Sequence, residues 1–219
     1  MLMEAERAAV VRYGRAMVDS GLTTGTGGNV SCRAREGELV AISPSGVPYA
    51  DLEPGNVAVV DLDGEKVEGD AKPSSELGFH LALYRHRGDV GGVVHTHSVY
   101  ATTLACLNWE IPAVHYLVGF AGSKVPVAPY ATFGSEALAR HVRDTMGTAY
   151  NAVLMANHGL VAVGPDLSRA FDTAEEIEFV ARVFCQAKAI GDPVALDAAE
   201  MRRVIEKFKT YGRQESPPA

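Results

Sequence analysis

Residues 91–97, Gly-Gly-Val-Val-His-Thr-His, form a short apolar run that ends in two histidines one residue apart. The run is too short for a core helix and begins with glycines, so it predicts a buried β-strand. Successive side chains of a strand point to opposite faces, which places His95 and His97 on one face and Thr96 on the other. A domain built around this strand must therefore accommodate two imidazoles at one end of its sheet.

The rest of the chain alternates irregularly between helix and strand patterns. A short strand follows the Gly/Thr-rich loop of residues 21–28, and Ser75 and Asp166 are the expected N-caps of two helices. Apolar residues at helical spacing predict helices over residues 4–20, 76–86, 98–107, 135–146, 166–190 and 199–209. Apolar runs predict further strands over residues 39–43 and 57–64, and two more within 151–164 that break near residues 157–159.

This element order predicts the fold class. Regular βαβ alternation and a Gly-x-Gly-x-x-Gly motif are both missing, which argues against a Rossmann fold. We therefore expect an α/β protein, a three-layer αβα domain with a central, mainly antiparallel sheet. No linker or low-complexity tract divides the sequence, so we expect one domain over residues 1–219, with residues 213–219 as a frayed tail.

Charge and cysteine content restrict the partners and the compartment. The net charge of -7 leaves no basic footprint for nucleic acid, so a bound anion must be held by local groups. Three scattered cysteines without a Cys-x-x-Cys motif favour reduced thiols. The N-terminal segment has no apolar core long enough for a signal peptide or a membrane span. We expect a cytoplasmic protein that binds neither nucleic acid nor membranes.

The histidines predict a metal site. His95 and His97 share a strand face, and His158 sits at the break between two later apolar runs. Three imidazoles with an open position match a catalytic zinc site, although imidazole also suits other divalent metals. A carboxylate in an equally unusual setting, Glu76, adds a fourth candidate ligand. His80, His86 and His141 lie on predicted helices, where we expect surface or core-edge residues, and His115 is ambiguous.

Three small polar turns predict an anion site. The segments Gly-Thr-Gly-Gly-Asn-Val-Ser (residues 25–31), Ser-Pro-Ser-Gly-Val-Pro (43–48) and Lys-Pro-Ser-Ser-Glu (72–76) each expose backbone N–H groups and hydroxyls without bulk. If they converge, they form an anion-binding nest, and the helix start after Ser75 adds a positive dipole end. Ordinary turn chemistry is the alternative. The chain has no P-loop motif, which argues against a nucleotide site.

These segments, together with His-Thr-His (95–97), Pro-Tyr-Ala-Thr-Phe-Gly (129–134) and Asn-His-Gly-Leu (157–160), resemble the class II aldolase/adducin family in order and spacing. The resemblance covers about residues 5–212, nearly the whole chain. Within the family, the pattern is nearest to the aldolases that cleave L-fuculose 1-phosphate. The resemblance implies an αβα fold and a homotetramer with active sites at subunit interfaces.

The resemblance also implies roles for individual residues. His95, His97 and His158 match the family's zinc ligands, one ion per subunit. Glu76 matches its catalytic acid/base, which can also ligate the metal when substrate is absent. Tyr116 resembles a tyrosine that reaches into the neighbouring subunit's site. Positions that hold the substrate phosphate or shape the aldehyde pocket are matched by Gly28, Asn29, Ser45, Gly46, Ser74, Ser75, Phe133 and Tyr211.

The expected reaction is metal-dependent cleavage of a ketose 1-phosphate resembling L-fuculose 1-phosphate into dihydroxyacetone phosphate and a short aldehyde such as L-lactaldehyde. For its proton transfer, the pKa of Glu76 should lie above that of a free carboxylate. L-Ribulose-5-phosphate 4-epimerases of the same family are the alternative, but they usually carry Ser-Ser-Asp where this chain has Ser-Ser-Glu at residues 74–76. A methylthioribulose-phosphate dehydratase and a non-catalytic, adducin-like interaction protein are weaker alternatives.

Overall fold

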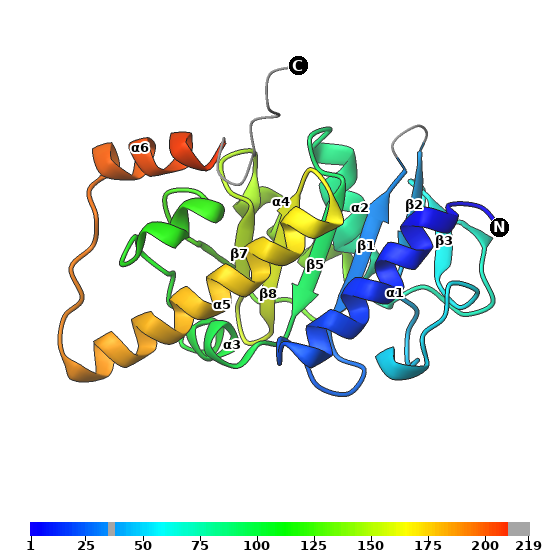
Figure 1. Cartoon of the computed structure of the whole chain (residues 1–219), viewed down its shortest axis with the longest axis horizontal. Coiled ribbons are helices and arrows are strands. Elements are labelled where there is room, and N and C mark those ends of the chain that lie inside the picture. The colour runs from blue at the N-terminus through cyan, green and yellow to red at the C-terminus, as the bar shows by residue number, and fades with distance from the viewer. Residues whose placement is uncertain (35–37, 210–219) are drawn as a thin grey trace, which may run out of the picture.

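A computed structural model describes residues 1–34 and 38–209. Its centre is a sheet of eight strands in the order β4-β3-β2-β1-β5-β8-β7-β6 (Figure 1). All neighbouring strands pair antiparallel except β6 and β7, which are parallel. The strands are β1 Asn29–Arg33, β2 Leu39–Ile42, β3 Ala58–Asp61, β4 Lys66–Glu68, β5 Gly92–Thr96, β6 Val127–Ala128, β7 Ala152–Met155 and β8 Gly159–Gly164.

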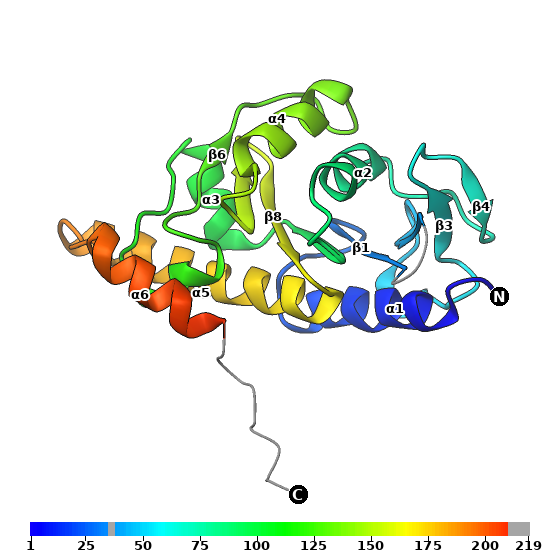
Figure 2. The ribbon, with the colours of Figure 1, turned by 90° about the horizontal axis from the view of Figure 1, so that it is seen from above.

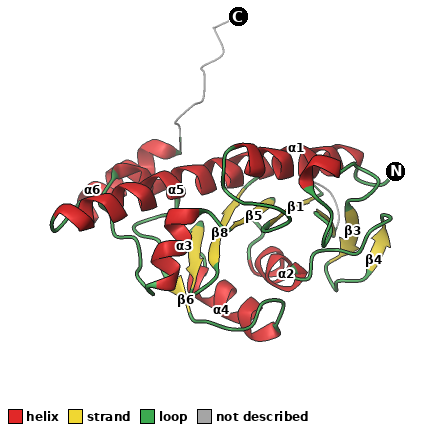
Figure 3. Cartoon of the chain, turned by 90° about the horizontal axis from the view of Figure 1, so that it is seen from below, coloured by secondary structure: helices red, strands yellow, loops and turns green. Residues whose placement is uncertain are grey.

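Helices cover both faces of this sheet. Figures 2 and 3 show α1 and α5 along one face and α2 and α4 on the other. The α-helices of the described chain are α1 Glu4–Asp19, α2 Leu77–His86, α3 Val99–Cys106, α4 Glu136–Met146, α5 Leu167–Ile190 and α6 Ala198–Phe208, and two 3-10 helices are η1 Tyr49–Asp51 and η2 Tyr116–Phe120. The predicted three-layer αβα architecture with a mainly antiparallel sheet is confirmed.

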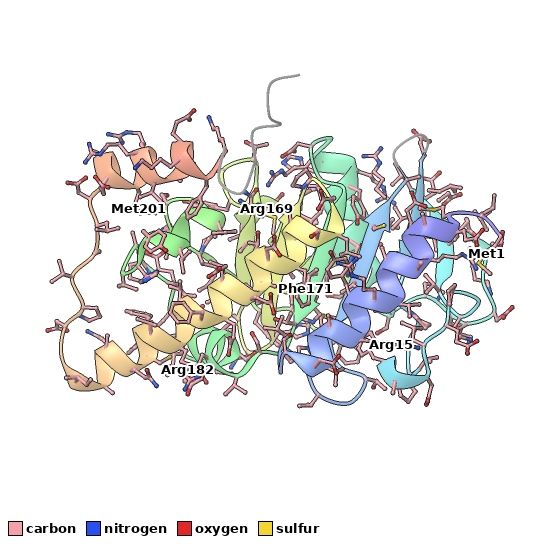
Figure 4. All side chains as sticks on the ribbon, in the orientation of Figure 1. Met1, Arg15, Arg169, Phe171, Arg182 and Met201 are labelled. Carbon is pink, nitrogen blue, oxygen red and sulfur yellow. The ribbon has the colours of Figure 1, made fainter. Side chains whose placement is uncertain are left out.

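Each helical layer closes its own hydrophobic core against the sheet. On the α1/α5 side, Phe171 of α5, labelled in Figure 4, belongs to one core. Its ring packs against Tyr13 of α1, with ring centroids 5.3 Å apart. On the α2/α4 side, Phe79 and Leu138 belong to a second core together with Val93 of β5. Because both faces of β5 are buried, the whole strand is apolar except where it carries His95 and Thr96.

Helix α5 follows the sequence prediction closely. The Asp166 side chain caps it by accepting a hydrogen bond from the Arg169 N–H at 2.8 Å. A Cβ added at Gly92 would lie 2.5 Å from the backbone of Leu167, so this glycine lets the helix start pack directly on β5. None of the described helices has the length and apolar character needed to cross a membrane.

The start of α2 differs from the prediction. Glu76, and not Ser75, occupies the N-cap position, and the Ser74 hydroxyl accepts a hydrogen bond from the Glu76 N–H at 3.2 Å. The helix therefore begins directly after the carboxylate. Since β1 begins at Asn29 opposite His95 near the end of β5, the start of α2 and these strand ends meet at one edge of the domain.

Candidate active site

The structure brings the three predicted histidine ligands together. His95 lies near the end of β5, His97 follows that strand, and His158 lies in the turn between β7 and β8. The Nε2 atoms of His95 and His97 are 3.0 Å apart. One potential ligand atom from each of the three residues lies within 4.8 Å of the others, so the cluster could hold a metal ion.

Hydrogen bonding from Nδ1 of His95 turns its Nε2 toward His97 and Glu76. The His95 Nδ1 donates to the Leu160 carbonyl at 2.9 Å, and the side chain is fully buried. A neutral imidazole that donates from Nδ1 keeps its lone pair on Nε2, which is the atom that faces His97. Burial and then the neighbouring His95 lower the pKa of His158 to about 4, which keeps the His158 ring neutral at neutral pH.

Close backbone packing holds β5, the strand that carries His95, beside the turn that precedes β1. Gly28 has φ +67, and an added Cβ would lie 2.5 Å from the His95 carbonyl oxygen. Only glycine combines a left-handed backbone with such a close approach at little cost. The Gly-rich turn thus contacts the backbone of His95 directly, and it also lines the cavity described below.

Glu76 faces this cluster from the start of α2. Its Oε2 lies 3.2 Å from His95 Nε2, and its Oε1 lies 3.3 Å from His158 Nε2. The Asn29 side-chain amide donates to Oε2 at 3.0 Å. Oε1 is buried and forms no hydrogen bond within the described chain. One carboxylate oxygen is thus held by protein, and the other remains available beside the imidazoles.

The pKa of Glu76 moves opposite to the sequence expectation. Burial raises it, but the interactions of the carboxylate with His95, with His158 and with the Asn29 amide together outweigh burial, and the pKa falls to about 2. The expectation of a raised pKa is wrong for the site without ligands. The carboxylate is therefore ionised at neutral pH and begins as a proton acceptor.

These observations fit a divalent cation. Three imidazoles with converging nitrogens are a donor set that zinc and several other divalent metals accept. An ionised, buried carboxylate with one oxygen lacking a hydrogen-bond partner is costly unless a cation or a proton meets it. The orphaned Glu76 oxygen beside His158 is the observation that points to such a partner.

His80 was expected at the surface or the core edge, and this prediction is wrong. Its side chain is fully buried on α2, with Nε2 2.5 Å from Asn29 Oδ1 and Nδ1 2.7 Å from the Ser31 hydroxyl. The Ser31 hydroxyl in turn lies 2.8 Å from the Tyr84 hydroxyl. Sequence reasoning missed this network because only the β1–α2 packing brings its members together.

The three polar turns converge on one cavity of about 430 Å³ beside the cluster. Ser74 is buried there, whereas Ser45, Gly46 and Ser75 are exposed and open to a ligand. The side-chain amide of Asn29 is bonded to Glu76 and His80, which leaves one N–H of its Nδ2 for other contacts. All the predicted phosphate positions line this cavity: Gly28, Asn29, Ser45, Gly46, Ser74 and Ser75.

The predicted aromatic residues have three different placements. Phe133 lines the cavity beside Tyr130, and both rings are exposed. Tyr116 lies outside the cavity in its own chain, where it is 52% exposed and stacks on Phe208. Tyr211 lies outside the described residues. The cavity also receives Asn157, which has φ +54 and which sequence reasoning did not single out as a site residue.

Comparison with known proteins identifies the family of the chain. The family described as Class II Aldolase and Adducin N-terminal domain matches residues 8–185. A 5-deoxy-D-ribulose 1-phosphate aldolase of Bacillus thuringiensis serovar kurstaki is 51% identical over 214 residues, which cover 98% of this chain and 100% of the relative. An L-fuculose phosphate aldolase of Escherichia coli K12 is 43% identical over 198 residues, 90% of each chain.

Solved structures give the same result. A structure of an L-fuculose 1-phosphate aldolase superposes with a TM-score of 0.93 at 42% sequence identity and covers 95% of this chain and 98% of its own. The family match spans most of the chain, and the relatives are similar over nearly their full lengths. The chain therefore belongs to the class II aldolase and adducin family.

Proposed function

We propose that this protein is a metal-dependent aldolase that cleaves a ketose 1-phosphate to dihydroxyacetone phosphate and a short aldehyde. The observation that carries the proposal is the free Oε1 of Glu76, which lies beside three converging histidines at a cavity lined by polar turns. A proton acceptor, a cation site and an anion site are the three parts that aldol chemistry on a sugar phosphate requires.

One divalent cation per subunit, preferably zinc, would be held by His95, His97 and His158, with Glu76 as a further ligand in the absence of substrate. Such a cation supplies a Lewis acid that polarises the ketone carbonyl and stabilises negative charge beside it. The turns before β1, after β2 and before α2 would bind the phosphate through N–H groups and hydroxyls, which orients the reacting carbons.

The proton transfers are simplest to follow in the condensation direction. The Glu76 carboxylate takes a proton from C3 of dihydroxyacetone phosphate, and C3 then forms a bond to the aldehyde carbon. The aldehyde oxygen takes a proton and becomes the C4 hydroxyl. Tyr116 of a neighbouring subunit is our candidate for that donor, in a homotetramer with sites at its interfaces. Cleavage is the reverse of these steps.

The aldehyde end of the substrate is proposed to be small and apolar. L-Fuculose 1-phosphate would release L-lactaldehyde, whereas a 5-deoxyribulose 1-phosphate would release acetaldehyde, and both fragments end in a methyl group. The exposed rings of Phe133 and Tyr130 at the cavity suit such an end. The 51% identical relative supports 5-deoxyribulose 1-phosphate as the second candidate, and we propose Phe133 and Tyr211 as residues that shape this pocket.

A substrate panel tests the proposal. Metal-loaded protein is incubated with L-fuculose 1-phosphate, 5-deoxy-D-ribulose 1-phosphate, L-ribulose 5-phosphate and unphosphorylated L-fuculose. Released dihydroxyacetone phosphate is measured with a coupled reductase, and epimers are measured by NMR. We expect dihydroxyacetone phosphate from a ketose 1-phosphate and much less cleavage of the free sugar. Interconversion of L-ribulose 5-phosphate and D-xylulose 5-phosphate without cleavage of the 1-phosphates would instead identify an epimerase.

A further inference from the structure

A row of buried polar groups extends behind Glu76, away from the cavity. It runs from Asn29 on β1 to His80 on α2, then to Ser31 and Tyr84. The side chains of His80 and Ser31 are fully buried, and Asn29 and Tyr84 are nearly so. Buried polar groups are retained at a cost, so a fully bonded row of four directly behind a reactive carboxylate calls for a reason.

The contacts give Asn29 one amide orientation. The Asn29 Nδ2 group donates to Glu76 Oε2 at 3.0 Å, and its Oδ1 then faces His80 Nε2 at 2.5 Å. A carbonyl oxygen can only accept, so His80 Nε2 must carry a hydrogen. Burial lowers the pKa of His80 to about 3, so its ring is neutral and Nδ1 accepts from Ser31. Every contact in the row then has a donor and an acceptor.

In this orientation of the Asn29 amide, the two Glu76 oxygens have different contacts. Oε2 accepts from Asn29, whereas Oε1 has no hydrogen-bond partner in the described chain. If the Asn29 amide turned over, its oxygen would face the carboxylate and repel it. The His80 ring opposes that rotation because Nε2–H would then face an NH2 group. The ring thus helps to keep the Asn29 donor on Oε2, although His80 is not among the residues that line the cavity.

We propose that His80 is a positioning residue for proton transfer at Glu76, acting through the Asn29 amide that its Nε2–H holds in place. This inference rests on the proposed function, because it assigns Glu76 the transfer of a proton at a substrate carbon. His80 differs from a merely structural core residue in one respect: the position of a single donor atom matters, and the volume of the ring alone does not suffice.

Two amide substitutions separate these roles. A glutamine amide nitrogen can take the place of Nε2, so His80→Gln keeps a donor toward Asn29. An asparagine amide reaches only the Nδ1 position, so His80→Asn keeps the Ser31 contact and loses the Asn29 contact. Both place an amide in the same buried site, which makes their stability costs comparable. His80→Phe replaces the asparagine variant if that protein does not fold, and Tyr84→Phe alters the far end of the row as a control.

For each protein, kcat and KM for the cleaved ketose 1-phosphate, metal content and the urea midpoint are measured. We expect His80→Asn to lower kcat by at least about 10-fold, a part of the 100-fold or greater effect typical of acid–base catalysis. Its KM and metal content should stay close to wild type. His80→Gln should recover most of kcat, and Tyr84→Phe should retain it.

The outcomes are distinguishable. If His80→Asn, His80→Gln and wild type have equal kcat, the inference about His80 is wrong and the proposed function stands. The same holds if both variants lose kcat equally and the loss follows the decrease in their urea midpoints. A metal-loaded wild type that neither cleaves a ketose 1-phosphate nor exchanges protons of dihydroxyacetone phosphate overturns the proposed function, and the inference falls with it.

Discussion

At the scale of single residues, the site depends on which nitrogen of the His95 ring faces the other histidines. His95 donates from Nδ1 to Leu160, and this contact presents its Nε2 to His97 and Glu76. A ligand oriented by a second contact loses little freedom when it binds a metal. The Leu160 contact would therefore orient His95 toward a bound cation, and replacement of this ring should lower the metal content.

We predict that His95→Ala lowers the metal content of the purified protein from about one divalent ion per chain to a small fraction of that. Loss of one of three imidazole ligands removes the central donor of the cluster, whose ring lies near both other imidazoles. His86→Ala is the matched control, because His86 is exposed at the end of α2. Elemental analysis by mass spectrometry gives the answer. Equal metal content in the two variants would rule out this site.

The same scale shows what the sequence can and cannot predict. His95, His97, His158 and Glu76 were identifiable because their residue types are unusual beside strand ends and at a helix start. His80 was not, because a histidine on an amphipathic helix has the pattern of a core-edge residue. Its partner Asn29 is 51 positions away in sequence, and only the packed structure shows their contact.

At the scale of elements, the Gly-rich turn before β1 sets the position of β5. Gly28 lies against the His95 carbonyl oxygen, whereas Gly25, in the same turn, has a similar φ of +63 but nothing within 4 Å of an added Cβ. Both glycines thus have a left-handed backbone, but only Gly28 packs closely against the backbone of β5. Alanine substitutions at Gly25 and Gly28 can therefore separate backbone strain in the turn from displacement of β5, the strand that carries His95.

We predict that Gly28→Ala destabilises the protein more than Gly25→Ala does. A non-glycine residue in the left-handed region costs about 1–2 kcal/mol in each, and overpacking against the strand adds about 1–3 kcal/mol at Gly28 alone. Gly28→Ala should also weaken metal binding, because the clash acts on His95. Urea unfolding and metal titration measure both effects. Identical unfolding free energies and metal affinities in the two variants would contradict the close approach.

Elements differ in how far local sequence determines them. Helix α5 was predictable from its Asp166 cap, its apolar stripe and the glycine that follows it, and it spans Leu167–Ile190. Strand β6 has only two residues, Val127–Ala128, and forms by parallel pairing with β7. The 3-10 helix η2 likewise has no strong periodicity, and the α5 and α6 helices pack against it. Tertiary contacts, and not local preference, create these two elements.

At the scale of the whole molecule, the position of Tyr116 bears on the proposed assembly of several chains. Tyr116 is half exposed and stacks on Phe208 of its own chain, outside the cavity that contains Glu76. A proton donor for the aldehyde oxygen must lie at hydrogen-bond distance from it. If Tyr116 has this role, it serves the site of a neighbouring subunit, and closed symmetry would give every subunit both a donor and an acceptor edge.

We predict complementation between two weakly active variants. Co-assembly of Glu76→Gln with Tyr116→Phe chains should give some interfaces that pair an intact Glu76 with an intact Tyr116. Activity of the mixture should then exceed that of both parent proteins. Native mass spectrometry confirms that hybrid assemblies have formed. Verified hybrids with no more than the weighted sum of the parental activities would contradict a shared site.

We propose that Glu76 transfers a proton at the carbon of dihydroxyacetone phosphate that becomes the nucleophile. NMR measures it most directly, as exchange of one C3 hydrogen of dihydroxyacetone phosphate for deuterium in heavy water, without any aldehyde. Metal-loaded wild type should catalyse this exchange, whereas Glu76→Gln, with most of its metal retained, should be slower by at least about 100-fold. Exchange at the wild-type rate in Glu76→Gln, or no exchange in folded, metal-loaded wild type, would contradict the account.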